Sequence, residues 1–263
     1  SCRLKLDDEN LSYIDFKKNE SGDIFTLLKE RSGLPLRKIA SDVYLEMLIN
    51  NPTITHRESE IEYREPELIE YPRDLIEMFP KSVNSLFLED NIEGATQSFF
   101  DIRYDKRNNR ILIPIYKEDI LIGLNGRINN KYPPENCPKY YTYLPYPKSK
   151  ALYGWDINKE YILESNSVIL VESEKSVMKA FQKGIRNILA VGCSHISKYH
   201  LSQITEELGI KNILVCFDKG YETEFILKNI SKISKEGVNF YIFDANECVE
   251  LNNKECLFDK NLP

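Results

Sequence analysis

Two short apolar runs in the second half of the chain each end in an acidic residue. Residues 168–171 are followed by Glu172, and residues 213–217 are followed by Asp218. Apolar runs of this length between polar boundaries are typical of strands that are buried on both faces of a sheet. Because open parallel sheets bind ligands at the carboxyl ends of their strands, the two carboxylates are predicted to lie side by side in a crevice.

The pattern around these runs predicts the rest of the fold. Helices are expected at residues 174–183, 197–208 and 222–233, between strands at residues 168–171, 187–191, 213–217 and 239–243. Such alternation predicts a parallel sheet with covering helices. Upstream, a β-meander is predicted from residues 99–104, 110–116 and 120–127, followed by a proline-rich loop at residues 132–147.

The net charge of −6 hides an asymmetry along the chain. Residues 103–150 contain 10 Lys and Arg against 4 Asp and Glu, which is a local charge of +6, so the remainder sums to −12. A basic block inside an acidic chain is the electrostatic footprint of a polyanion-binding surface. On charge alone, a solvated basic face is the favoured alternative.

Composition excludes several other classes of protein. The 263 residues contain no apolar stretch of 18 residues, no signal peptide pattern and, among six cysteines, no CxxC pair. The sequence therefore predicts no membrane association and a cytoplasmic location, and its length allows two domains.

Paired carboxylates opposite basic residues are suited to phosphoryl transfer. Carboxylate oxygens are the preferred ligands of Mg²⁺, and the metal and nearby Lys or Arg stabilise charge on the phosphoryl group. Arg127 can clamp a phosphate through two hydrogen bonds, whereas Lys139 and Lys150 act as point charges. Tyr140 can stack on a base of a single strand, although packing of the tyrosine-rich loop onto its own domain is an equal alternative.

Six short motifs, in order, resemble bacterial and phage replicative primases of the DnaG-like type. The basic subdomain of those enzymes is similar to residues 110–115 (RILIPI), 122–127 (IGLNGR), 138–140 (PKY) and 150–154 (KALYG). The TOPRIM domain that follows it is similar to residues 171–177 (VESEKSV) and 217–220 (FDKG). The resemblance covers roughly residues 100–245 and implies a basic α+β subdomain, then an α/β TOPRIM domain with a mainly parallel sheet.

The resemblance also implies an activity and its residues. Primases of this kind synthesise short RNA primers on single-stranded DNA from nucleoside triphosphates, with Mg²⁺ or Mn²⁺, and a replicative helicase is a further candidate partner. Positions that match nucleotide and template contacts are Arg110, Arg127, Lys139, Tyr140 and Lys150, of which the two lysines are also candidate catalytic residues. Candidate metal ligands are Glu172, Asp218, Glu222 and Asp244, and the first two are also candidate catalytic residues.

The chain departs from this pattern at three places. The second acid of the Asp-x-Asp pair is Gly220, with Glu222 as a candidate replacement. Residues 13–25 resemble the tail of a zinc ribbon but lack ligands at the expected positions, so no zinc is expected. The helical bundle that serves helicase docking is not expected in this chain.

These observations predict a domain order and leave three functions open. The expected order is a degenerate zinc-ribbon and helix remnant at residues 1–50, a basic primase-like subdomain at 51–164 and a TOPRIM domain at 165–263. The favoured function is a primase that works by metal-dependent nucleotidyl transfer. The alternatives are a non-catalytic single-strand-binding or regulatory protein of a phage or mobile element, and a TOPRIM nuclease.

Overall fold

The computed structural model divides into two compact units, Ser1–Arg64 and Glu65–Pro263. It describes residues 2–6, 11–15, 20–23, 28–29, 31–35, 38–39, 42–43, 67–134 and 137–259. In the first unit an antiparallel sheet joins β1 (Cys2–Leu6), β2 (Leu11–Asp15) and β3 (Glu20–Asp23). Half of the expected ribbon and helix remnant at residues 1–50, and the residues that link it to the second unit, lie outside the described residues.

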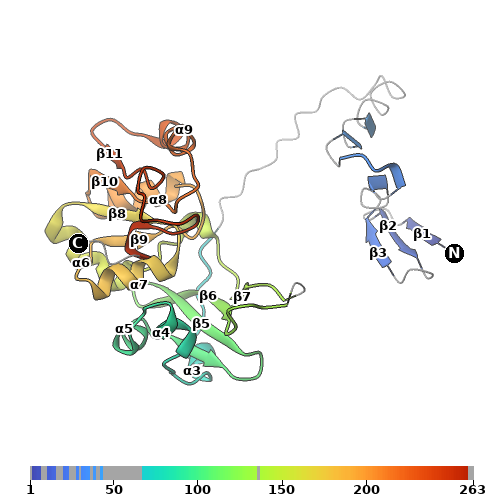
Figure 1. Cartoon of the computed structure of the whole chain (residues 1–263), viewed down its shortest axis with the longest axis horizontal. Coiled ribbons are helices and arrows are strands. Elements are labelled where there is room, and N and C mark those ends of the chain that lie inside the picture. The colour runs from blue at the N-terminus through green and yellow to red at the C-terminus, as the bar shows by residue number, and fades with distance from the viewer. Residues whose placement is uncertain are drawn as a thin grey trace. The chain divides into compact units, whose positions relative to one another are not determined.

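The second unit begins with three short helices and an antiparallel sheet (Figure 1). The helices are α3 (Asp74–Glu77), α4 (Ser85–Glu89) and α5 (Gly94–Phe99). The sheet has the order β4 (Arg103–Asp105), β5 (Arg110–Lys117), β6 (Ile120–Ile128) and β7 (Tyr140–Leu144). The predicted meander is confirmed, but the bounds of its first strand were wrong, because Phe99 belongs to α5 and the strand begins at Arg103. The loop prediction was wrong at β7, because the prolines of this segment flank residues 140–144 and leave them free to pair with β6.

The second sheet is wholly parallel and has the order β11-β10-β8-β9. Its strands are β8 (Val168–Val171), β9 (Ile188–Ala190), β10 (Asn212–Val215) and β11 (Asn239–Ile242). The helices are α6 (Trp155–Ser165), α7 (Glu174–Gln182), α8 (Lys198–Ser202), which continues as a π-helical turn (Gln203–Glu207), and α9 (Thr223–Ile233). Short 3₁₀ turns cover Lys148–Lys150 and Leu257–Asp259. The predicted strand–helix alternation is confirmed.

Apolar side chains of β8 alternate between two cores. Val168 and Leu170 pack in the cluster that includes α6, α8 and α9, whereas Ile169 and Val171 pack in the cluster that includes α7. Burial on both faces explains why this strand carries only apolar residues.

One of these cores also joins the two sheets. Ile111 and Ile113 of β5 belong to the same buried cluster as Val177 and Met178 of α7. Because close-packed interiors resist deformation, this shared core fixes the spacing between the antiparallel sheet and α7. No helix in the described part of the chain is long and apolar enough to cross a membrane.

Candidate active site

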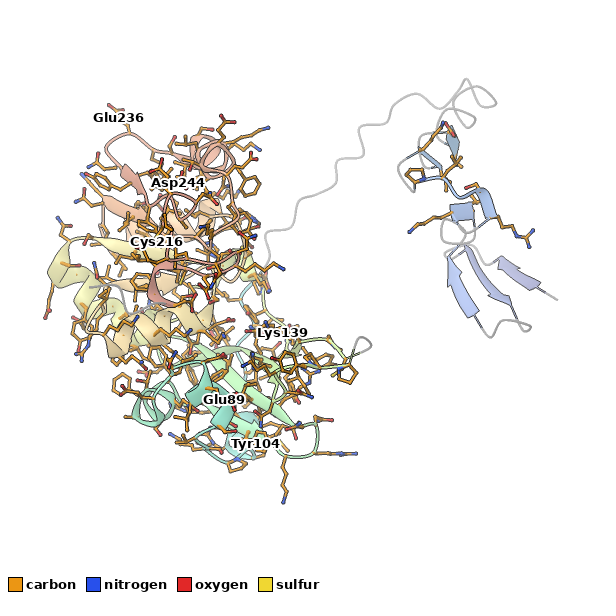
Figure 2. All side chains as sticks on the ribbon, viewed as in Figure 1. Glu89, Tyr104, Lys139, Cys216, Glu236 and Asp244 are labelled. Atoms are coloured by element: carbon orange, nitrogen blue, oxygen red, sulfur yellow. The ribbon has the colours of Figure 1, made fainter. Side chains whose placement is uncertain are left out.

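A cleft of about 1030 Å³ lies between the antiparallel half and the parallel half of the second unit. One wall comes from the end of α4 and the start of β7, with Asp90, Lys139 and Tyr140. The other comes from the segments that follow β8 and β10, from α7 and from the C-terminal segment, residues 251–259. Figure 2 shows Lys139 between the two halves.

Glu172 is placed in the cleft by an abrupt change from strand to helix. β8 ends at Val171, and Ser173 caps α7 by accepting a hydrogen bond from the backbone N–H of Ser176 at 3.3 Å. A serine cap satisfies one of the free N–H groups at a helix start. The Tyr221 hydroxyl donates to Glu172 Oε1 at 3.2 Å, which orients the carboxylate.

Asp218 joins Glu172 because their strands are neighbours. β10 pairs with β8 in parallel, with Val215 opposite Leu170, so the segments that follow the two strands each carry an acid at the same edge of the sheet. Asp218 Oδ1 is buried and has no hydrogen-bond partner among the described residues. Burial, and then the charge of Glu172, raise the pKa of Asp218 to about 7. Burial also raises the pKa of Glu172.

These two carboxylates fit a divalent cation. A cation would give Asp218 Oδ1 the partner that it lacks and would offset the repulsion between the two acids. The described residues contain no group of three or more His, Cys, Asp or Glu side chains that could hold a metal. Water and substrate phosphates would therefore complete the ligand set, as is usual for Mg²⁺.

Glu222 and Asp244 do not line the cleft. Glu222 is exposed at the start of α9. Asp244 accepts hydrogen bonds from Thr223 Oγ1 and from the backbone N–H of Asn246, and Figure 2 shows it well apart from Lys139. The four acids expected as metal ligands are therefore not brought together, because the last two serve the start of α9 and its neighbouring loop.

The backbone conformation at residue 220 also explains why glycine stands there in place of the second acid. Its φ is +114°, a conformation that L side chains rarely adopt, although a Cβ there would meet nothing within 4 Å. Its N–H donates to Asn246 Oδ1 at 3.1 Å, which holds the loop in this shape. An acid at this position would strain the loop that carries Asp218.

Two of the four expected basic residues lie at the cleft or next to it. Lys139 lines the cleft, and its pKa is lowered first by burial and then by the charge of Arg127. Arg127 is 4% exposed, with its Nη2 3.6 Å from Asp90 Oδ2. Arg127 is therefore buried next to Lys139 and helps to hold Asp90.

Arg110 faces the other way, and the sheet register explains this. Arg110 pairs with Ile128, so Arg127, one residue earlier on β6, points to the opposite face. Arg110 donates to the carbonyls of Gly126 and Pro138, both at 3.0 Å. It thereby holds the segment that leads to Lys139.

Lys150 also lies away from the cleft. Its Nζ is 4.6 Å from the centre of the Tyr199 ring on α8. The expectation that Arg110, Arg127, Lys139 and Lys150 converge on one groove is therefore not met.

Tyr140, which was expected to stack on a base, lines the cleft. Tyr143 and Tyr146 pack on their own sheet. A Cβ at Gly126 would lie 2.4 Å from the Tyr143 ring, and a Cβ at Gly123 would lie 2.3 Å from the Tyr146 ring. The glycines of the IGLNGR motif thus make room for aromatic rings. For Tyr143 and Tyr146 this is the alternative in which the tyrosine-rich loop packs onto its own domain.

Of the six lysines that line the cleft among the described residues, only Lys139 was predicted as a site residue, and three of the others lie on α7 or at its end. Lys175, Lys179 and Lys183 follow one another at intervals of four residues, and all three line the cleft from α7 and its C-cap. Helical neighbours four residues apart share a face, so this spacing was a usable signal. Glu174 and Lys175 stand at the start of α7, where charged residues are usually solvated. Glu174 is buried and accepts from Asn125 Nδ2 at 2.9 Å.

Comparisons with known proteins agree with this arrangement. No protein-family model matches the sequence. A DNA primase from Legionella pneumophila is 30% identical over 119 residues, which is 44% of this chain and 20% of that protein. A DNA primase from Staphylococcus aureus (strain COL) is 26% identical over 141 residues, which is 53% of this chain and 23% of that protein.

Two solved structures share the fold. The DnaG primase catalytic domain bound to single-stranded DNA matches with a TM-score of 0.53 and 16% identity, over 65% of this chain and 68% of that chain. The zinc-binding and RNA polymerase domains of the Aquifex aeolicus primase match with a TM-score of 0.55 and 17% identity, over 92% and 76%.

The chain therefore shares the fold of DnaG-type primase catalytic domains, and the predicted fold class is confirmed. A divalent metal, which the resemblance to primases implies, fits the pair formed by Glu172 and Asp218. The matched segments span only about a fifth of the length of the curated relatives.

Proposed function

We propose that this chain is the catalytic core of a primase that joins ribonucleotides into short RNA primers on single-stranded DNA. The observation that carries the proposal is the pair Glu172 and Asp218, with a buried carboxylate oxygen that lacks a partner, in a cleft that Lys139 also lines. The names of the curated relatives support it, as does the structure of a related domain bound to single-stranded DNA.

Five of the residues that line the cleft have a chemical role in this proposal. Glu172 and Asp218 hold Mg²⁺ or Mn²⁺, which supplies positive charge to the transferred phosphoryl group. Tyr221 orients the Glu172 carboxylate through its hydrogen bond to Oε1. Lys139 binds a phosphate as a point charge, and Tyr140 beside it stacks on a base.

The proposal extends to partners and organisation. Nucleoside triphosphates and single-stranded DNA are the proposed ligands, and a replicative helicase is a proposed partner in the cytoplasm. Residues 51–164 and 165–263 are proposed to act as a basic subdomain and a TOPRIM domain around the cleft.

Primer synthesis with labelled ribonucleotides on a single-stranded DNA template tests the function. The wild-type protein is expected to make short labelled RNA with Mg²⁺ or Mn²⁺. Glu172→Gln is expected to abolish synthesis and keep strand binding, because it removes a metal ligand. Lys139→Ala is expected to weaken both, because it removes a phosphate contact.

Glu224→Gln serves as the control for loss of an acid, since Glu224 is exposed on α9 outside the cleft. Equal synthesis by the wild-type protein and Glu172→Gln would contradict the proposed role of the acids. Shortening of the template in the same reactions would indicate a nuclease instead.

Gly220 favours a second candidate function, a non-catalytic single-strand-binding or regulatory protein. It removes one acid, and Glu222 does not line the cleft as a substitute. Strand binding that depends on Lys139, without product in either metal, would select this function.

A further inference from the structure

One face of α7 presents a row of lysines to the cleft. Lys175, Lys179 and Lys183 are four residues apart, which corresponds to about 6 Å of helix rise between neighbours. Lys179 is only 7% exposed, so its ammonium group is held within the wall of the cleft. Buried lysines are rare unless they are paired.

Each of these lysines is held by an acceptor from a distant part of the chain. Lys175 Nζ lies 2.8 Å from Asp90 Oδ2, and Lys179 Nζ lies 2.5 Å from Asp259 Oδ1. Lys183 Nζ donates to the carbonyl of Phe258 at 2.8 Å. Carboxylate oxygens from two separate segments thus occupy the positions where an anion would contact α7.

The pKa of Asp90 reflects its contact with Lys175. Burial acts to raise the pKa of Asp90, but the hydrogen bond from Lys175 and the nearby positive charges bring it below its ordinary value. Asp90 also lies 3.6 Å from Arg127 Nη2, so this one carboxylate engages cations of both walls.

The cleft as a whole is balanced in charge. Among the described residues it is lined by six lysines, namely Lys139, Lys175, Lys179, Lys183, Lys219 and Lys254. It is also lined by six acids, namely Glu89, Asp90, Glu172, Asp218, Glu255 and Asp259. A divalent cation on Glu172 and Asp218 would make the cleft net positive, which favours entry of an anion.

We propose that the lysine face of α7 is a phosphate-binding surface, and that Asp90 and Asp259 occupy it until a phosphorylated ligand displaces them. The inference rests on the proposed function, since a nucleotidyltransferase must hold phosphates beside its acids. The ligand is the triphosphate of a nucleotide or the backbone of a single strand. Both present the oxygens that lysines bind, so the experiment must separate them.

Equilibrium binding of ATP and of a single-stranded oligothymidine, each with Mg²⁺, tests the proposal. Lys175→Gln and Lys183→Gln are each expected to weaken binding of one of the two ligands by about tenfold, the effect of one lost charged hydrogen bond. The ligand that loses affinity identifies the source of the phosphate. Lys228→Gln, on α9 outside the cleft, is the matched control.

The acids give a test in the opposite direction. Asp259→Asn is expected to raise affinity for the same ligand severalfold, because Lys179 loses its competing partner. Glu224→Gln controls for the change in net charge. Thermal unfolding checks that each variant is folded.

Unchanged affinity for both ligands in Lys175→Gln and Lys183→Gln would overturn the inference, and the lysines would then be structural. If the wild-type protein makes no primer but binds ATP in a way that depends on these lysines, only the proposed function is overturned.

Discussion

At the scale of single residues, Asp218 carries the most information. Its carboxylate is buried beside another acid, and one of its oxygens has no partner among the described residues. Keeping a buried carboxylate charged costs free energy, because the group has lost its contact with water. Such groups occur at functional sites, where a bound ligand offsets this cost. The same environment makes metal binding depend on pH.

Mn²⁺ affinity is expected to rise with pH. A proton and a cation compete for Asp218, whose pKa is raised to about 7 by burial and by Glu172. Affinity should therefore increase by about tenfold per pH unit below pH 7 and level off above it. Titration with Mn²⁺ by electron paramagnetic resonance at several pH values measures this, and a flat profile would contradict it.

Asp218→Asn is the control for this dependence and has a second readout. The raised pKa means that the folded state binds the proton more tightly than the unfolded state. The contribution of Asp218 to metal-free stability therefore falls as pH rises from about 4 to about 7. Asp218→Asn should raise the melting temperature of the metal-free protein at pH 8 and change it little at pH 4.

At the scale of elements, β6 shows how sequence and packing are linked. Gly126 leaves room for the Tyr143 ring, whose hydroxyl donates to Asp105 Oδ2 at 2.7 Å. The ring is therefore held in place and cannot move aside easily. This explains why the motif requires glycine on a strand, where glycine is otherwise disfavoured.

Gly126→Ala is expected to lower the free energy of unfolding by about 1–3 kcal/mol, the usual range for overpacking. Urea unfolding measures the loss. In the double variant with Tyr143→Ala the clash is absent, so the loss should be smaller than the sum of the two single losses. Additive losses would show that the ring does not cause the effect.

The sequence predicted elements more reliably than the direction of side chains. The apolar runs before Glu172 and Asp218 identify neighbouring parallel strands, and the structure brings both acids to one cleft. The basic motifs do not show which face of a sheet they occupy. Arg110 and Arg127 point to opposite faces because the pairing of β5 with β6 offsets them by one residue.

The lysines of α7 were missed for a different reason. The helix itself was predicted, and the four-residue spacing of Lys175, Lys179 and Lys183 was visible in the sequence. However, a lysine row on a helix usually faces solvent. The contacts that turn it toward a cleft come from Asp90 and Asp259, which no local pattern connects to α7.

At the scale of the whole molecule, the antiparallel half and the parallel half of the second unit act as one body because they share a core. Ile113 of the antiparallel sheet and Met178 of α7 belong to one buried cluster. The cleft therefore has walls of fixed spacing, and the proposed binding of a single strand would rely on charges that these walls already present.

Affinity for a single strand is expected to fall steeply with salt. Each phosphate contact contributes about −0.7 to the slope of log affinity against log salt concentration. Lys139→Ala should therefore make the slope shallower by about 0.7, whereas Lys228→Ala on α9 should leave it unchanged. Fluorescence anisotropy across a sodium chloride series measures both slopes. Identical slopes for the wild-type protein and Lys139→Ala would place the phosphate contacts elsewhere.

The C-terminal segment ties the loop of Asp218 to the rest of the fold. The Lys219 N–H donates to the carbonyl of Glu255, and the Lys254 N–H donates to the carbonyl of Lys219, both at 2.8 Å. A ligand that holds the Asp218 loop in place is therefore expected to reduce local unfolding of the C-terminal segment as well. Its susceptibility to a protease that cuts after lysine thus becomes a reporter of cleft occupancy, readable on a gel without any catalytic turnover.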